Sequence, residues 1–141
     1  MNRIYSETLP FEDVARKRTI ELLRRYELEI VLAVRPWEIE KLPDVARALR
    51  DGGVSLAVWP MLSDEEGRWA SVHNAASFTE LTRRTVGTLL DRDLRPRDVL
   101  LDLEPPFNAA RGLTPDAKGE GIFRLASGVA KPASRTRLEE A

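Results

Sequence analysis

Short apolar runs that end at or near a proline alternate with amphipathic stretches along this chain. Runs rich in β-branched residues predict buried strands, because proline cannot donate a hydrogen bond to a sheet ladder and so marks where each strand stops. Apolar residues at helical spacing predict the helices between them. The pattern predicts a very short first strand at Ile4-Tyr5, strands over 28–34, 54–59 and 98–103, and helices over 10–26, from Pro43 to Gly52, and from Ser77 to about Arg92.

The run Asp98-Val99-Leu100-Leu101-Asp102-Leu103-Glu104-Pro105-Pro106 is the stretch with most chemical content. Side chains alternate across a strand, so Leu100, Asp102 and Glu104 share one face, with the two carboxylates roughly 7 Å apart. An unpaired carboxylate in an apolar site costs several kcal/mol or is driven to its protonated form. Two interpretations are open. The acids serve chemistry, or Glu104 is solvated and Asp102 is paired with an arginine.

Alternating strands and helices predict an α/β fold built from parallel βαβ units. A small open sheet and part of an eight-stranded (β/α) barrel both fit this alternation, and we expect the amino-terminal half of a TIM-type barrel. Residues 1–107 make up this unit, whereas 108–141, rich in glycine and polar residues, predict an irregular carboxyl-terminal tail.

Composition narrows the function classes. The 141 residues carry a net charge of −1 with acids and bases mixed, which lacks the basic footprint of nucleic-acid binding and the cationic cluster of membrane-surface binding. Cysteine is absent, which excludes disulfides and thiolate chemistry. No membrane-spanning run, secretory leader or phosphate-binding glycine loop is present, so we expect a cytoplasmic protein without a nucleotide cofactor.

Chemistry-bearing residues follow the carboxyl ends of successive predicted strands, where parallel α/β folds bind their ligands. The three tryptophans are candidate stacking platforms for sugar rings, although a tryptophan at a strand end also fills cores. A metal site has no specific ligand spacing here, and we expect no metal or other cofactor. The candidate substrate-binding residues are Arg35, Trp37, Trp59, Trp69, His73 and Asn74, and the candidate catalytic residues are Asp102 and Glu104.

Asp102-Leu103-Glu104 followed by Pro106 resembles the end of the fourth-strand signature of family 18 glycoside hydrolases. The resemblance covers one strand; Leu100 and Arg97 stand at the family's earlier acidic positions, and Pro105 replaces its aromatic residue. It implies that Glu104 protonates the leaving sugar oxygen and that Asp102 orients the acetamido group of the substrate. Independently of the family, burial and a neighbouring carboxylate raise the pKa of an acid enough for this role.

A complete barrel takes about 250 residues, so this chain predicts at most half of one, with two open sheet edges. We therefore expect a truncated or partial glycoside hydrolase-like protein that acts on a carbohydrate, is inactive alone and self-associates through its edges. The alternative is a self-contained small α/β domain that binds a partner or ligand without catalysis.

Overall fold

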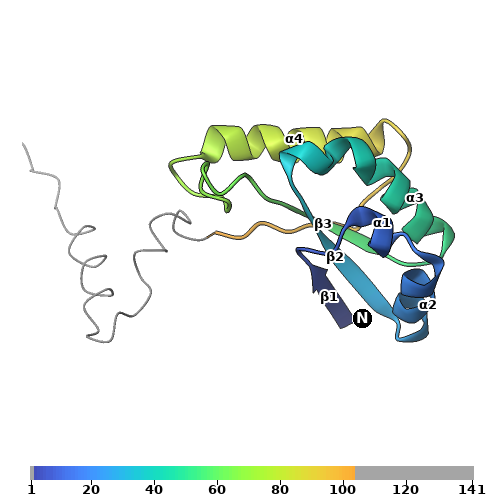
Figure 1. Ribbon diagram of the computed structural model, residues 1–141. Coiled ribbons are helices and arrows are strands. Elements are labelled where there is room, and N and C mark those ends of the chain that lie inside the picture. Colours follow the sequence, from blue (N-terminus) through green and yellow to red (C-terminus); the bar gives the residue numbers. More distant parts are fainter. Residues whose placement is uncertain (1, 104–141) are drawn as a thin grey trace, which may run out of the picture. The chain divides into compact units, whose positions relative to one another are not determined.

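The computed structural model describes residues 2–103, which form an α/β fold with a four-stranded, all-parallel sheet. The strands are β1 (Asn2–Ser6), β2 (Leu28–Val34), β3 (Leu56–Pro60) and β4 (Asp98–Val99), and they lie side by side in chain order, β1-β2-β3-β4 (Figure 1). Parallel βαβ units are thus confirmed, and β2 has the predicted limits. The first strand is longer than the two residues predicted, because all five residues of β1 pair with β2.

The helices are α1 (Phe11–Val14), α2 (Lys17–Arg25), α3 (Leu42–Asp51) and α4 (Ala75–Leu90), with a 3₁₀ helix, η1 (Pro36–Lys41), before α3. The single helix predicted over 10–26 is wrong in one respect, since the backbone of Arg16 is extended and separates α1 from α2. The break is supported by the Thr19 hydroxyl, which donates a hydrogen bond of 2.8 Å to the carbonyl oxygen of Asp13. None of the helices within residues 2–103 combines the length and apolar composition needed to cross a bilayer.

Two helix ends test the predicted capping residues. Gly52 and Gly53 end α3 as expected: Gly53 has a φ of 74°, and a Cβ on Gly52 would collide with the Ile20 side chain. The predicted start of α4 at Ser77 is wrong. The helix begins two residues earlier, after Asn74, and Ser77 is an exposed residue within its first turn.

One face of the sheet is covered by the helices, and we call it the helix-covered face. Alternate residues of β2 and β3 on this face pack with the buried residues of all four α-helices in a single apolar core. The core residues from the strands are Ile30, Leu32, Val34, Leu56 and Val58.

The opposite face, which we call the open face, carries Glu29, Val31 and Ala33 of β2 and Ala57 of β3. These residues are at most 2% exposed, yet none of them belongs to the helix-packed core. Figure 1 shows the helices of residues 2–103 on the other side of the strands. Burial on the open face comes instead from neighbouring strands and from long side chains that fold over it.

The predicted strand over 98–103 is only partly formed. Pairing with β3 covers Asp98 and Val99, and the next residues continue through single contacts. The expected burial of its apolar side is wrong, because Val99, Leu101 and Leu103 are 39%, 54% and 78% exposed. The physical reason is that β4 is an edge strand, and nothing within residues 2–103 packs on its outer side. The predicted tail, 108–141, lies outside the described residues.

Candidate functional site

The long connection between β3 and α4 is held in shape by Asn74. Its side-chain amide donates to the carbonyl oxygens of Glu66 and Trp69, both at 2.9 Å, and its Oδ1 accepts from the backbone N–H of Ser71 at 2.8 Å. Asparagine side chains often close such turns because they mimic a backbone amide. Asn74, predicted to bind substrate, therefore has a structural role that uses both ends of its amide.

A carboxylate bridge joins the loops that follow β1, β2 and β3. Arg35, at the end of β2, donates to the Glu7 carbonyl at 2.9 Å, and its guanidinium lies 3.6 Å from the Glu7 carboxylate. Arg68, in the loop after β3, donates to the same carboxylate at 3.3 Å. Both arginine side chains are only about one-fifth exposed. Arg35 is thus placed at the carboxyl end of the sheet as predicted, with Glu7 and Arg68 as partners that the sequence pattern did not single out.

Arg68 is held in an uncommon backbone conformation. Its φ is 57°, and its side chain pairs with Asp64 at 2.6 Å while its guanidinium lies 5.5 Å from the centre of the Trp69 ring. Cations stack on tryptophan in this way because the ring face is electron-rich. A sequence signal was present, since Arg68 stands four residues after Asp64, the first residue of the acidic run Asp64-Glu65-Glu66.

Asp102 lies beside the same loop. The backbone N–H of Ala70 donates to the carbonyl oxygen of Asp102 at 3.1 Å, and Ala70 and Leu103 form a parallel bridge. Trp69 is therefore next in sequence to Ala70, the residue that contacts the segment carrying Asp102. The Asp102 residue is half-buried, and Glu104, the predicted proton donor, lies outside the described residues.

Two aromatic side chains meet on the open face. Tyr5 of β1 and Trp59 of β3 pack edge to face with ring centres 5.9 Å apart. Tyr5 is 58% exposed, whereas Trp59 is half-buried. Trp59 thus packs against Tyr5, an aromatic partner that the sequence pattern did not reveal, and its role as a ring platform stays a prediction.

Two of the predicted site residues stand apart from this group. Trp37 lies on η1 and is 63% exposed, and His73 is exposed on the loop before α4. Within residues 2–103, no three Asp, Glu or His side chains come together as metal ligands. The structure therefore brings Arg35 close to Arg68 through Glu7, and Arg68 in turn lies over the Trp69 ring. Asp102 lies beside Ala70, the residue after Trp69.

The amino-terminal half of the open face carries a charged cluster. Glu29 is 1% exposed, accepts a hydrogen bond of 2.6 Å from Arg3, and lies 3.8 Å from the Arg97 guanidinium. Arg3 also pairs with Asp98 of β4. The hydrogen bond that Arg3 donates to Glu29 raises the pKa of Arg3 and so favours the charged guanidinium. One Glu29 oxygen, Oε1, is buried and accepts no hydrogen bond within the described residues.

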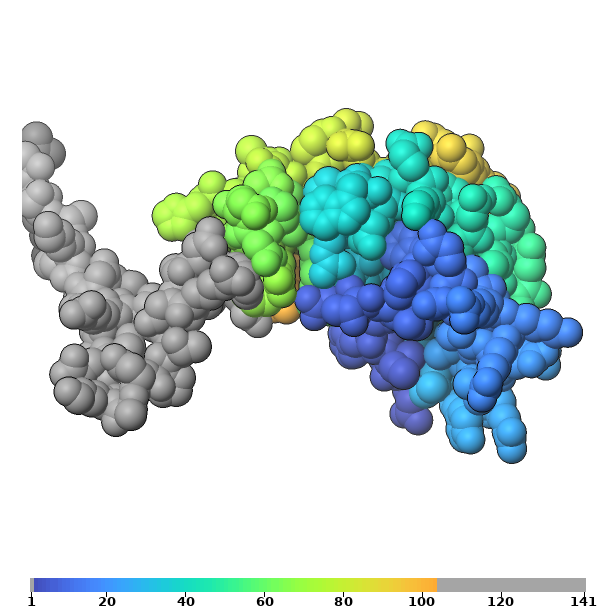
Figure 2. Space-filling view, in the orientation of Figure 1, coloured from blue at the N-terminus to red at the C-terminus, as the bar shows by residue number. Residues whose placement is uncertain are grey.

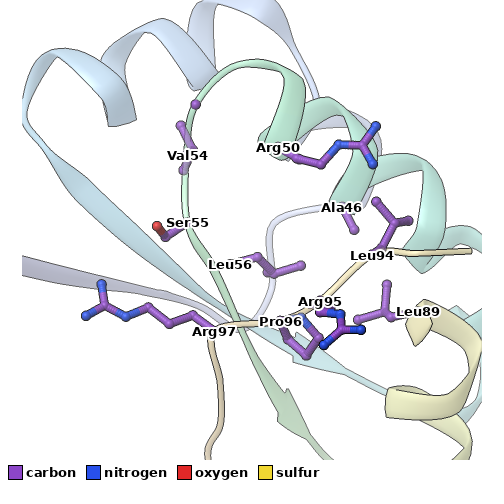
Figure 3. A pocket seen from close by; sticks show the side chains of 11 residues that line it. Ala46, Arg50, Val54, Ser55, Leu56, Leu89, Leu94, Arg95, Pro96 and Arg97 are labelled. Atoms are coloured by element: carbon purple, nitrogen blue, oxygen red, sulfur yellow. The ribbon is translucent and has the colours of Figure 1, made fainter.

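A cavity of about 290 Å³ lies at the amino ends of β3 and β4 (Figure 3). It is lined by apolar residues of α3 and α4 and by Arg50, Arg95 and Arg97, with no carboxylate or histidine among its lining residues. Figure 3 shows that the three arginines diverge, with Arg97 directed away from Arg50 and Arg95. The cavity therefore lacks a convergent set of polar groups for a ligand.

Comparison with protein-family models, with curated proteins and with solved structures finds no match for this chain. Its chemistry is therefore argued from the arrangement of its own residues. At the carboxyl ends of the strands, Glu7 connects the segments that follow β1, β2 and β3 through its contacts with Arg35 and Arg68. Ala70, in the loop after β3, is hydrogen-bonded to Asp102 in the segment that follows β4.

Proposed function

We propose that residues 2–103 form the first half of a (β/α)8 barrel. Four parallel strands in chain order, with every α-helix packed on one face, support this assignment, since doubly wound sheets reverse their strand order and place helices on both faces. In a barrel, the helix-covered face is the outside and the open face lines the interior.

The curvature of the sheet supports the same proposal. Three spacings between strands separate β1 from β4, about 14 Å in a flat sheet. Arg3 of β1 nevertheless forms an ion pair with Asp98 of β4 across the open face. A side chain that reaches from one edge strand to the other indicates a sheet that curls toward its open face, as barrel sheets do.

We further propose that the completed barrel hydrolyses a carbohydrate at its carboxyl end, with Glu104 as the general acid beside Asp102. The observation that carries this proposal is the convergence of four strand-end segments at that edge, through Glu7, Arg35, Arg68 and the Ala70–Asp102 hydrogen bond. Trp59 and Trp69 offer apolar faces for a sugar ring near the same edge. One open sheet cannot enclose a sugar, so activity requires a closed barrel.

The test is hydrolysis of a panel of chromogenic aryl glycosides by the full chain in its assembled form. We expect Glu104→Gln to lower turnover by about 100-fold or more, the usual contribution of a general acid. The matched control is Glu65→Gln, which removes an exposed carboxylate from the loop after β3 and leaves turnover unchanged. Equal activity in both variants would remove Glu104 from the acid role. A closed assembly that hydrolyses none of the panel would favour a binding domain without catalysis.

A further inference from the structure

We propose that two copies of this chain close one eight-stranded barrel, with β1 of each copy pairing in parallel with β4 of the other. This inference rests on the half-barrel architecture proposed above, and it identifies the partner that completes the site.

Both edges of the sheet are available for pairing. In the part of the chain that the structure describes, no strand pairs with the outer edge of β1 or of β4. Four of the five residues of β1 are exposed, and the segment lies at the surface, drawn dark blue in Figure 2. An unpaired edge presents a row of free N–H and C=O groups that readily recruits another strand.

Apolar side chains lie beside both edges on the same side of the sheet. Ile4 pairs in register with Ile30, and Val99 pairs in register with Val58, so both belong to the helix-covered side but lie beyond its core. Ile4 is 44% exposed and Val99 is 39% exposed, and Leu101 follows Val99 at 54%. Placing β1 of one copy beside β4 of the other brings these apolar residues together and removes them from water.

Charges on the open side are complementary as well. Arg3 projects from β1 on the open face and Asp98 projects from β4 on the same face, where they already form an ion pair within one chain. Across the proposed seam, Arg3 of one copy lies one strand away from Asp98 of the other, so each edge meets an opposite charge. The β1 edge of one copy thus matches the β4 edge of the other in both apolar and charged residues.

The strand number identifies the partner as a second copy. Eight strands close a barrel whose interior is just filled by side chains, and two copies of this sheet supply eight. A twofold axis makes both seams identical, so one edge-to-edge match closes the ring and leaves no edge free. The mouth at the carboxyl end would then take Asp102 and Trp69 from both copies, which makes the site incomplete in one copy.

The first experiment is mass measurement of the full chain by sedimentation equilibrium over a range of concentrations. We expect a species of twice the 15.9 kDa of one chain. Ile4→Lys, which puts a charge at the edge of β1, should weaken association at least tenfold. Leu22→Lys is the matched control, because Leu22 is 45% exposed on α2 and belongs to neither edge strand, so this variant should leave the mass unchanged.

Cysteine pairs test the seam directly and do not depend on the folding of Ile4→Lys. The chain has no cysteine, so Ile4→Cys with Leu101→Cys introduces two unique thiols. Within one sheet these positions lie on opposite edge strands, so a short bifunctional thiol reagent should join two chains through both seams. Ile4→Cys with Arg84→Cys, which places the second thiol on the exposed surface of α4, should give no such product.

A monomer at every concentration would overturn the inference. Large, polydisperse assemblies would overturn it in favour of open-ended pairing, and a dimer equally stable in both lysine variants would place the interface elsewhere. These results are independent of turnover. A dimer without glycosidase activity would uphold the two-copy barrel and reject the proposed hydrolase function. An active monomer would reject the two-copy barrel and uphold the hydrolase function.

Discussion

The two faces of β2 bury their residues equally well but by different means. Leu32 and Val34 on the helix-covered face are fully buried in an apolar core built by four helices. Val31 and Glu29 on the open face are just as inaccessible, although neither belongs to the helix-packed core; on this face Arg3 pairs with Glu29, and Tyr5 packs against Trp59. Parallel sheets are normally covered on both faces. Under the half-barrel proposal, the open face is an interior whose other half a second copy of the chain supplies.

The largest expected effect separates the two faces directly. Val34→Ala should lower the free energy of unfolding by about 2–3 kcal/mol, because it leaves a cavity in a helix-packed core. Val31→Ala, the matched change on the other face, should cost about 1 kcal/mol, because no helix within residues 2–103 packs on it and the flexible side chains of this face can move into the space it leaves. Urea unfolding of dilute, monomeric protein measures both. Equal losses would mean that the open face is as tightly packed as the helix-covered face.

The charged cluster offers a second test of the open face. Arg3→Met leaves the Glu29 carboxylate buried without its closest partner, and should lower stability more than the double variant Arg3→Met with Glu29→Leu, which removes both charges. Chemical denaturation of the two variants decides the ranking. A double variant that is less stable than the single one would show that the cluster itself, and not the burial of an unpaired charge, supports this face.

A smaller, local effect is expected at the carboxyl edge. Asn74→Ala removes three hydrogen bonds within the loop after β3 and should destabilise it by about 1–3 kcal/mol, with little change in the sheet. Hydrogen exchange of residues 63–73 should accelerate while the amides of β2 keep their protection. His73→Ala is the control, because the exposed His73 side chain should contribute nothing measurable to the loop.

The smallest effect is expected at the exposed ion pair between Glu12 of α1 and Lys41 of η1. A hydrogen bond from Lys41 lowers the pKa of Glu12 below its ordinary value of 4.5. Because the folded-state pKa is the lower one, the contribution of Glu12 is present above about pH 4.5 and is lost as the pH falls through the folded value. Glu12→Gln should therefore flatten the stability profile slightly in that range. Thermal unfolding from pH 3 to 7 checks this, and an unchanged profile would assign the pair no role.

The sequence was most informative where local and tertiary preferences agree. The β-branched run of β2, its end before Pro36 and the Gly52-Gly53 helix end all lie as predicted, because burial and backbone geometry require those residue types there. The prediction for the next strand, 54–59, is wrong at both ends: β3 begins at Leu56, and Pro60, predicted to stop it, is its last residue and pairs with Val34. The sequence was least informative where a single polar contact determines where a helix begins or breaks. The Thr19 hydroxyl supports a helix break that apolar spacing does not reveal, and Asn74 displaces Ser77 as the start of α4.

The sequence predicted where the candidate site lies in the fold, but not which side chains pair with one another there. Strand-end residues such as Arg35 and Asp102 do lie at the carboxyl edge, because parallel strands place their ends together. Glu7 and Arg68 could not be found in this way, since their pairing joins residues 61 positions apart through geometry that only the fold supplies. The burial of the 98–103 run was overestimated because apolar content alone does not distinguish a central strand from an edge.

The ion pair between Arg3 and Asp98 also bears on the order of folding. It joins residues 95 positions apart, nearly the whole described part of the chain. Contacts so distant in sequence form late, because the entropy of closing a long loop must be met before they contribute. The pairing of β2 with β3 closes a much shorter segment, the crossover through η1 and α3. We therefore expect β1 to make its contact with β4 only after the helices between them have packed.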